Sequence, residues 1–251
     1  MLDFLKTPVA ALQEFYILSG RAIANIFRGP HYADDIALQM DNIGVGSLPI
    51  VILTGFFSGV VITMQMSRAL ATYGATDQVG SIVAITLVRE LGPVLTALLV
   101  AGRNASGIAS ELGSMKVTEQ IDAMRALGTD PIQKLVTPRM IACCLMLPCL
   151  TVIADFVGIL GGFIIAHFSL RLPASQYWTP AYHAIAYNDL AQGLLKPFVF
   201  AFVISLVGCF YGLRTTGGTQ GVGRATTQAV VVASVWIFVI TTLITRIFVN
   251  L

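Results

Sequence analysis

The sequence of 251 residues has little charge: 11% of its residues are Asp, Glu, Lys or Arg, whereas 56% are hydrophobic. Soluble domains carry roughly 25% charged residues, so this composition excludes an ordinary soluble globular protein. The net charge is only +2, and no run of Lys or Arg is present. We therefore expect a membrane protein that binds no nucleic acid.

Motifs for energy conversion and for metal or redox chemistry are also missing. None of the four lysines is preceded by Gly, so the phosphate-binding pattern GxxxxGK[ST] is absent, and there is no HExxH. The four cysteines form no CxxC pair, and we interpret them as small buried hydrophobic residues. The sequence predicts no enzymatic activity, no cofactor and no metal site. If the chain takes part in active transport, another polypeptide must hydrolyse the ATP.

What the sequence does contain is a series of long uncharged runs. Crossing a hydrocarbon core about 30 Å thick takes about 20 helical residues. Lipid-exposed backbone must satisfy its own hydrogen bonds, and the runs are continuously apolar, which favours helices over a β-barrel. The predicted fold class is an all-α polytopic membrane protein with five transmembrane helices, at residues 46–66, 79–102, 140–170, 197–213 and 225–245.

The remaining segments complete a single membrane domain over residues 1–251. Residues 1–45 form an N-terminal interfacial segment, in which apolar residues recur at helical spacing from Leu5 to Phe27 and stop at Gly29-Pro30. Residues 103–139 form a polar cytoplasmic segment. Residues 171–196 are expected to be an external loop whose aromatic side chains suit a membrane interface.

The distribution of Lys and Arg predicts the orientation. Placing the N-terminus, the 103–139 segment and the 214–224 loop on one side collects ten of the fifteen basic residues, whereas the other side holds four and Arg89 lies within a span. Basic residues are enriched on the cytoplasmic side. The N-terminus is therefore expected in the cytoplasm and the C-terminus on the opposite side.

Three charged residues, Arg89, Glu90 and Asp155, fall inside predicted spans. Each costs roughly 2.5–3.5 kcal/mol on insertion scales, so each should face protein or water. Neighbours on a helix point about 100° apart, so Arg89 and Glu90 are not expected to pair with each other, and one could meet another helix while its neighbour faces a cavity. They form either a structural ion pair between helices or a polar site in a substrate path, and Asp155 is equally open to a structural or a functional role.

A short helix is predicted from Thr118 to Leu127 inside the cytoplasmic segment. Thr118 suits the N-cap, Glu119 the first turn, Gly128 the position after the last turn, and Pro131 prevents continuation. Its charged residues lie away from an apolar edge formed by Ile121, Met124 and Leu127. It is either a solvated interfacial helix or a coupling helix that docks on a cytoplasmic motor protein.

A series of motifs runs through most of the chain from the first span onward. The motifs are Arg89-Glu90-Leu91-Gly92-Pro93-Val94, Ala101-Gly102-Arg103, Glu111-Leu112-Gly113-Ser114-Met115, Thr118-Glu119-Gln120, Asp130-Pro131, Pro138-Arg139, Leu147-Pro148, Gly158 to Gly162 and Gly223-Arg224-Ala225-Thr226-Thr227. They resemble those of the MlaE/YrbE-type permeases of MCE lipid transporters, and the block from Arg89 to Arg139 is the most specific part of the resemblance.

This resemblance implies a homodimeric ABC-transporter permease in a bacterial inner membrane, with the C-terminus in the periplasm. Two cytoplasmic ATPase subunits would bind the segment from Glu111 to Leu127, and a small STAS-type accessory subunit belongs to the same scheme. A periplasmic ring of MCE-domain proteins would exchange phospholipid with a pocket in the permease and so maintain outer-membrane lipid asymmetry.

The resemblance also implies site residues. By motif match, the lipid pocket would include Arg89, Glu90, Lys196 and Tyr73, and the first span would supply apolar walls through Leu53, Phe56 and Phe57. Contacts with the ATPase would come from Glu111, Lys116, Glu119, Asp122 and Arg125. No catalytic residue is implied.

Three other functions stay open at this point. A proton-coupled secondary carrier would use Glu90 and Asp155 as relay groups. A membrane scaffold would anchor a complex without forming a pocket. An ABC permease for small solutes would lack large apolar cavity walls.

Overall fold

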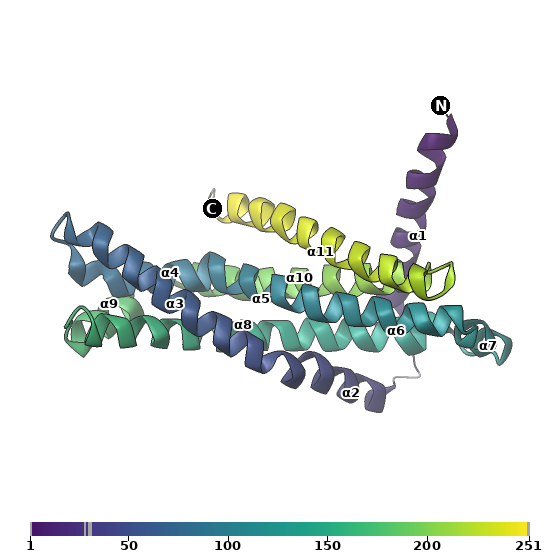
Figure 1. The fold of residues 1–251 in the computed structure, drawn as a ribbon, viewed down its shortest axis with the longest axis horizontal. Coiled ribbons are helices and arrows are strands. Elements are labelled where there is room, and N and C mark those ends of the chain that lie inside the picture. The colour runs from purple at the N-terminus through teal and green to yellow at the C-terminus, as the bar shows by residue number, and fades with distance from the viewer. Residues whose placement is uncertain (1, 28, 30–31, 250–251) are drawn as a thin grey trace. The chain divides into compact units, whose positions relative to one another are not determined.

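A computed structural model describes residues 2–27, 29 and 32–249, and these residues form helices and no strand (Figure 1). The predicted all-α class is confirmed. The α-helices are α1 (Leu2–Ile26), α2 (Ala33–Ile43), α3 (Leu48–Ala71), α4 (Val79–Thr86), α5 (Gly92–Val100), α6 (Ser106–Val117), α7 (Gln120–Ala126), α8 (Thr137–Phe168), α9 (Ala174–Ala184), α10 (Tyr187–Leu213) and α11 (Gly218–Val249). Two short 3₁₀ turns are η1 (Val45–Ser47) and η2 (Thr76–Gln78), and three π-helical turns are η3 (Leu87–Leu91), η4 (Ala101–Ala105) and η5 (Ile132–Val136).

Five helical stretches among the described residues are long and apolar enough to cross a membrane, which confirms the predicted number. Each is longer than the predicted span, because polar residues at its ends continue the helix. The stretches are Ala33–Ala71, Thr76–Val117, Ile132–Phe168, Tyr187–Leu213 and Gly218–Phe248. The N-terminal helix α1 ends at Ile26, before the expected stop at Gly29-Pro30, of which Pro30 lies outside the described residues.

The segment 171–196 differs from the expected loop. It contains α9 and the first turns of α10, which begins at Tyr187. The carboxylate of Asp189 explains this start: its Oδ2 accepts a hydrogen bond from the backbone N–H of Ala186, 3.0 Å away, at the residue just before the helix. An acidic side chain that reaches back to the N-cap N–H is half of a capping box.

The short helix of the cytoplasmic segment begins later than predicted. Thr118 is not its cap: the Thr118 hydroxyl donates to the Ser114 carbonyl in the last turn of α6, and α7 starts at Gln120. Glu119 precedes α7 in the left-handed conformation, with φ of 60°. The predicted end is confirmed, since Gly128 follows with φ of +80° and its N–H bonds to the Arg125 carbonyl.

The chain divides into two compact units. Unit 1 contains residues 1–43, 101–144 and 201–235; unit 2 contains residues 44–100, 145–200 and 236–251. Helices α8, α10 and α11 each contribute residues to both units.

The core of unit 1 joins α6, α7, α8 and α10 with part of α1. Ile121 of α7 is fully buried, so the short helix is anchored by an apolar side chain, whereas Leu127 at its other end is 83% exposed. Glycines of α10 approach α6 closely: a Cβ at Gly212 would meet Leu112 and the backbone of Ala109. The buried cluster is Leu18, Ala22, Ile108, Leu112, Ile121, Leu135, Val136, Met140, Leu206 and Cys209.

In unit 2, α3 and α8 pack backbone to backbone. A Cβ at Gly59 would collide with the carbonyl of Gly158, and one at Gly55 would meet the backbone of Ala154. Small residues at this spacing allow two membrane helices to approach closely. A second buried cluster joins α4, α8 and α9 through Val79, Val83, Leu87, Ala166 and Tyr177.

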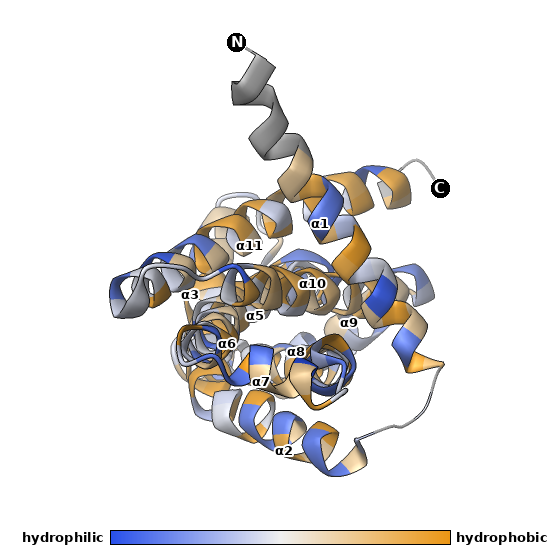
Figure 2. Ribbon diagram, turned by 90° about the vertical axis from the view of Figure 1, so that its right-hand side faces the viewer, coloured by the Kyte–Doolittle hydropathy of each residue, from blue (hydrophilic) through white to orange (hydrophobic). Residues whose placement is uncertain are grey.

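The helices differ in how hydrophobic residues are distributed along them. Figure 2 shows α5 and α10 largely in the hydrophobic colour, whereas α1 and α2 alternate between hydrophilic and hydrophobic turns. Leu12 and Tyr16 on α1, and Phe27 directly after it, are exposed, while Leu18 and Ala22 are buried in unit 1. This two-faced pattern is the one expected of a helix that lies at a membrane interface.

Candidate functional site

Unit 2 holds a cluster of polar side chains within otherwise apolar helices. It is built on η3, where the wider π-helical turn carries Arg89 and Glu90, and on the first three turns of α10. Single π turns within α-helices are frequent at functional sites. As predicted, Arg89 and Glu90 do not pair with each other; Arg89 pairs with Asp189, and Glu90 pairs with Lys196.

Glu90 is the centre of the cluster. Its Oε2 accepts from Lys196 Nζ at 2.6 Å, and its Oε1 accepts from the Thr245 hydroxyl at 2.9 Å and from Gln192 Nε2 at 3.4 Å. Lys196 Nζ also donates to the Arg89 carbonyl at 2.8 Å. One carboxylate therefore joins η3, α10 and the end of α11 within unit 2.

Arg89 forms a second ion pair beside the first. Its Nε lies 3.3 Å from Oδ1 of Asp189, and the other oxygen of Asp189 accepts from the backbone N–H of Ala186. The cluster thus balances two cations with two carboxylates, which offsets the desolvation cost of charges in a spanning helix.

The two sides of the cluster differ in access. The Lys196 side chain is fully buried, whereas those of Glu90 and Arg89 are 37% and 34% exposed. A bound molecule can reach the carboxylate and the guanidinium without displacing the lysine. These two groups attract an amine and a phosphate, respectively.

An apolar groove of about 460 Å³ begins at the residue after Glu90. Its walls come from α3 and from the η3–α5 segment, and it is wide open on one side. Its lining residues are Leu53, Thr54, Phe57, Ser58, Val61, Ile62, Leu91 and Leu95. Such a groove suits an alkyl chain, because only Thr54 and Ser58 add hydroxyl groups.

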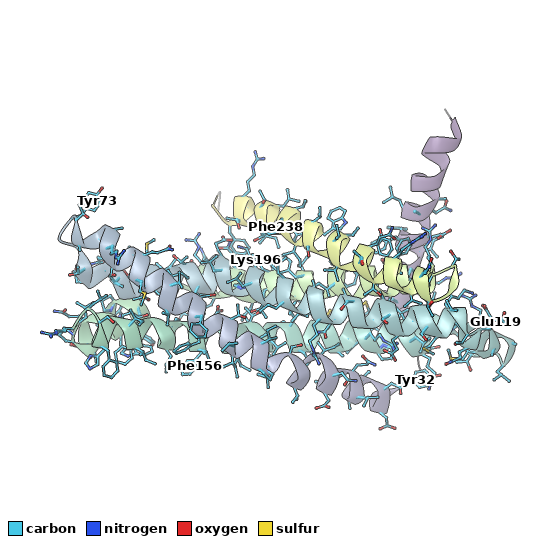
Figure 3. All side chains as sticks on the ribbon, viewed as in Figure 1. Tyr32, Tyr73, Glu119, Phe156, Lys196 and Phe238 are labelled. Atoms are coloured by element: carbon cyan, nitrogen blue, oxygen red, sulfur yellow. The ribbon has the colours of Figure 1, made fainter. Side chains whose placement is uncertain are left out.

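The predicted pocket residues do not all gather here. Leu53 and Phe57 line the groove, and Arg89, Glu90 and Lys196 form the polar cluster. Phe56 instead contacts Gly161 of α8. Figure 3 places Tyr73 at the tip of the turn after α3, away from Lys196 on α10, and its side chain is 83% exposed.

Asp155 lies in α8 against the first turn of α5. A Cβ at Gly92 would occupy the position of the Asp155 carboxylate, so the glycine makes room for it. Asp155 is 9% exposed, and its Oδ1 has no hydrogen-bond partner within the described part of the chain. It does not join the Glu90 cluster.

The residues predicted to contact an ATPase lie in unit 1. Asp122 of α7 pairs with Lys116 Nζ at 2.7 Å and with Arg125 NH1 at 3.1 Å, and the hydrogen bond from Lys116 holds the pKa of Asp122 below its ordinary value of 3.8. Glu111 of α6 pairs with the buried Arg139 at 2.7 Å. Glu119 is displayed at the turn before α7, as Figure 3 shows.

Sequence reasoning missed Asp189, Gln192 and Thr245. The first two lie seven and four residues before Lys196, on one face of α10. This spacing is that of one helix face, but the aromatic side chains of residues 171–196 favour an external loop at the membrane interface, and this expectation hides the helical pattern. Nothing in the sequence around Thr245 predicts its contact with Glu90, since a threonine hydroxyl can equally bond to a carbonyl of its own helix.

Comparisons with known proteins agree with this architecture. The family described as Permease MlaE matches residues 36–247. A probable ABC transporter permease protein of Rickettsia felis is 42% identical over 234 residues, covering 93% of this chain and 90% of the relative. One from Synechocystis is 41% identical, covering 89% and 85%. The chloroplastic protein TRIGALACTOSYLDIACYLGLYCEROL 1 of Arabidopsis thaliana is 37% identical, covering 89% and 64%.

The match over residues 36–247 includes the polar cluster, the apolar groove and the charged helix α7. Relatives of nearly equal length carry the name of transporter permeases. The chain therefore belongs to the MlaE permease family and is a membrane transporter permease.

Proposed function

We propose that this permease moves phospholipid, with the Glu90 cluster at the headgroup and the apolar groove at an acyl chain. The observation that carries the proposal is the direct succession of Glu90, in the ionic cluster, and Leu91, in the groove wall. A phospholipid has the same two parts in the same order. The name of the Arabidopsis relative, which contains that of a glycolipid, supports a lipid as substrate.

The energy source in this proposal is ATP hydrolysed by a cytoplasmic ATPase dimer. The chain has no nucleotide-binding motif of its own, and its relatives are named ABC transporter permeases. Helix α7 and the adjoining Glu111 and Lys116 form the docking surface. A small STAS-type subunit is proposed as a further cytoplasmic partner.

A second copy of the chain and a periplasmic ring of MCE-domain proteins complete the proposed assembly. Long apolar side chains on α11, among them Val231, Val235 and Phe238, are exposed and suit a second copy or lipid. The location is the bacterial inner membrane, with the N-terminus cytoplasmic and the C-terminus periplasmic. In this setting the transporter maintains outer-membrane lipid asymmetry.

The test is phospholipid transport by the assembled complex in vesicles. Glu90→Lys should abolish transport while the complex still assembles, because it places a third cation beside Lys196 and Arg89. Glu14→Lys, a charge reversal at the exposed pair with Arg214, is the matched control and should transport normally. Normal transport by Glu90→Lys would contradict the role of the cluster.

One alternative keeps a specific observation in its favour. A proton-coupled carrier needs a carboxylate that can change its protonation, and the Oδ1 of Asp155 has no partner among the described residues. Transport by the purified chain alone, driven by a proton gradient without ATPase, would establish that function. Transport that requires ATP and survives Asp155→Asn would exclude it.

A further inference from the structure

Unit 1 contains a second pocket, which shares no residue with the Glu90 cluster. It has a volume of about 260 Å³ and lies between the last turn of α2 and the start of α6. Six of its eight lining residues are Gln39, Asn42, Arg103, Asn104, Gly107 and Glu111, with two isoleucines, Ile43 and Ile108, as its apolar part. A pocket so small and so polar suits a headgroup and not an acyl chain.

The side-chain amide of Asn104 points to a missing ligand. Asn104 is only 7% exposed, and its Nδ2 has no hydrogen-bond partner among the residues that the structure describes. A buried donor without a partner costs about 1–3 kcal/mol. Asn104 lies in η4, and a π-helical turn at this point is a further sign of a functional position.

The charge of the pocket favours an anion. The guanidinium of Arg103 is held at the wall by a hydrogen bond from NH1 to the Asn42 carbonyl, 2.8 Å away. The other charged lining residue, Glu111, is balanced by its 2.7 Å ion pair with Arg139. The guanidinium fork and the Asn104 amide together provide the N–H donors that a phosphate group accepts from.

Both walls lie where the chain enters its apolar zone. Helix α2 ends at Ile43, shortly before the apolar helix α3, and η4 follows the apolar run of α4 to α5. The boundary between polar and apolar sequence is where the phosphates of a bilayer are expected to lie. Basic pockets between helices on the cytoplasmic side of a membrane bind anionic headgroups.

We propose that this pocket binds the phosphate of an anionic phospholipid as a resident lipid, through Arg103 and Asn104. The lipid fills the space between α2 and α6 and satisfies the buried amide. It is held and not transported, so the site does not rest on the proposed transport function. Soluble phosphate offers the same chemistry, and the experiment below separates the two sources.

The test uses the full chain in phosphatidylcholine nanodiscs that also contain phosphatidylglycerol. After the chain is extracted from the nanodiscs, native mass spectrometry counts the phosphatidylglycerol molecules that stay bound to it. Arg103→Gln should lower the retention of phosphatidylglycerol about tenfold, which is the loss of affinity expected when one charge-assisted hydrogen bond is removed. Arg103→Lys should lower it less, since it keeps the charge but loses the fork. Asn104→Asp should lower it through repulsion of the phosphate. Arg68→Gln, at the end of α3, is the matched control and should retain the wild-type amount.

Each outcome decides the proposal. Equal retention in wild type and Arg103→Gln would overturn it, as would equal retention of phosphatidylglycerol and phosphatidylcholine. Displacement of the lipid by inorganic phosphate, with binding that depends on Arg103, would identify a site for soluble phosphate and overturn the lipid. Arg103→Gln should still transport phospholipid in the assembled complex, because Arg103 lies outside the Glu90 cluster and the apolar groove, so failure of transport and failure of this site are separately visible.

Discussion

Two clusters of ion pairs in this chain have almost the same geometry and different surroundings. Lys196 Nζ lies 2.6 Å from Glu90 in unit 2, and Lys116 Nζ lies 2.7 Å from Asp122 in unit 1. The Lys196 side chain is fully buried, whereas that of Lys116 is 28% exposed and that of Asp122 is 47% exposed. Distance alone therefore does not measure what an ion pair contributes.

Solvent makes the difference. Around Lys196, whose side chain is fully buried, water cannot replace the carboxylate of Glu90, and the removal of one partner of a buried pair leaves an uncompensated charge. Around Asp122, water solvates both partners, and the pair contributes little to stability. The first cluster thus suits a site inside the membrane helices, and the second suits a surface that exchanges its solvent for a protein partner.

The largest expected effect is that of Lys196→Met. It should lower the free energy of unfolding by about 3 kcal/mol, the lower end for breaking a buried pair, because Glu90 keeps some access to solvent. The measurement is chemical unfolding in detergent. Lys116→Met is the matched control and should leave stability unchanged within error.

The double variant Glu90→Gln/Lys196→Met sharpens this test. With both charges gone, most of the lost stability should return. If the double variant were as unstable as Lys196→Met, lost packing and not the unpaired carboxylate would be the cause.

Gly59→Ala should have the next largest effect. Its Cβ would collide with the Gly158 carbonyl, and a backbone contact cannot rotate away, so we expect a loss of about 1–3 kcal/mol. Gly20→Ala on α1 is the control: nothing lies within 4 Å of its Cβ, and it should stabilise the chain by about 0.5–1 kcal/mol. Equal stability of the two variants would contradict the close approach of α3 and α8.

Glu119→Gly should raise stability by about 1 kcal/mol, because φ of 60° is strained for a residue with a Cβ. Glu119→Ala removes the same carboxylate but keeps the strain, so the difference in stability between the two variants measures the backbone strain alone.

The proposed docking of ATPase subunits on α7 has its own test. Glu119→Ala combined with Arg125→Ala should weaken the co-purification of the ATPase subunits without changing the fold.

The smallest effect is the pH response of the α7 pair. Lys116 and Arg125 lower the pKa of Asp122 in the folded chain, so the contribution of the pair is present above the unfolded value and is lost as pH falls through the folded pKa. Stability should not respond to this group between neutral pH and about pH 4. NMR titration of the Asp122 carboxyl should give a pKa below 3.8 in the wild type and a higher value in Lys116→Met.

The sequence was sufficient for the features that depend on composition and local order. Uncharged runs predicted five spanning helices, and Gly128 with Pro131 predicted the end of α7. That Arg89 and Glu90 do not pair with each other follows from the 100° between neighbours on a helix. These features need no knowledge of what each helix contacts.

Other features depended on tertiary contacts or on unusual backbone. The start of α10 at Tyr187 requires the Asp189 carboxylate to reach back to Ala186, and without it the segment was interpreted as a loop. Thr118 looked like a cap, but its hydroxyl bonds to Ser114 instead. The π-helical turns η3 and η4 have no simple pattern in sequence, so the cluster and the pocket built on them required the structure.

The π turn at Leu87–Leu91 also affects how sequences of relatives should be aligned. Such a turn contains one more residue than the α-helix would need, so a relative lacking one residue here would close into a regular helix. Every side chain beyond the deletion would then swing by about 100° around the axis. A one-residue gap at this point therefore marks a protein whose acidic side chain no longer meets its lysine, even where the flanking letters are identical.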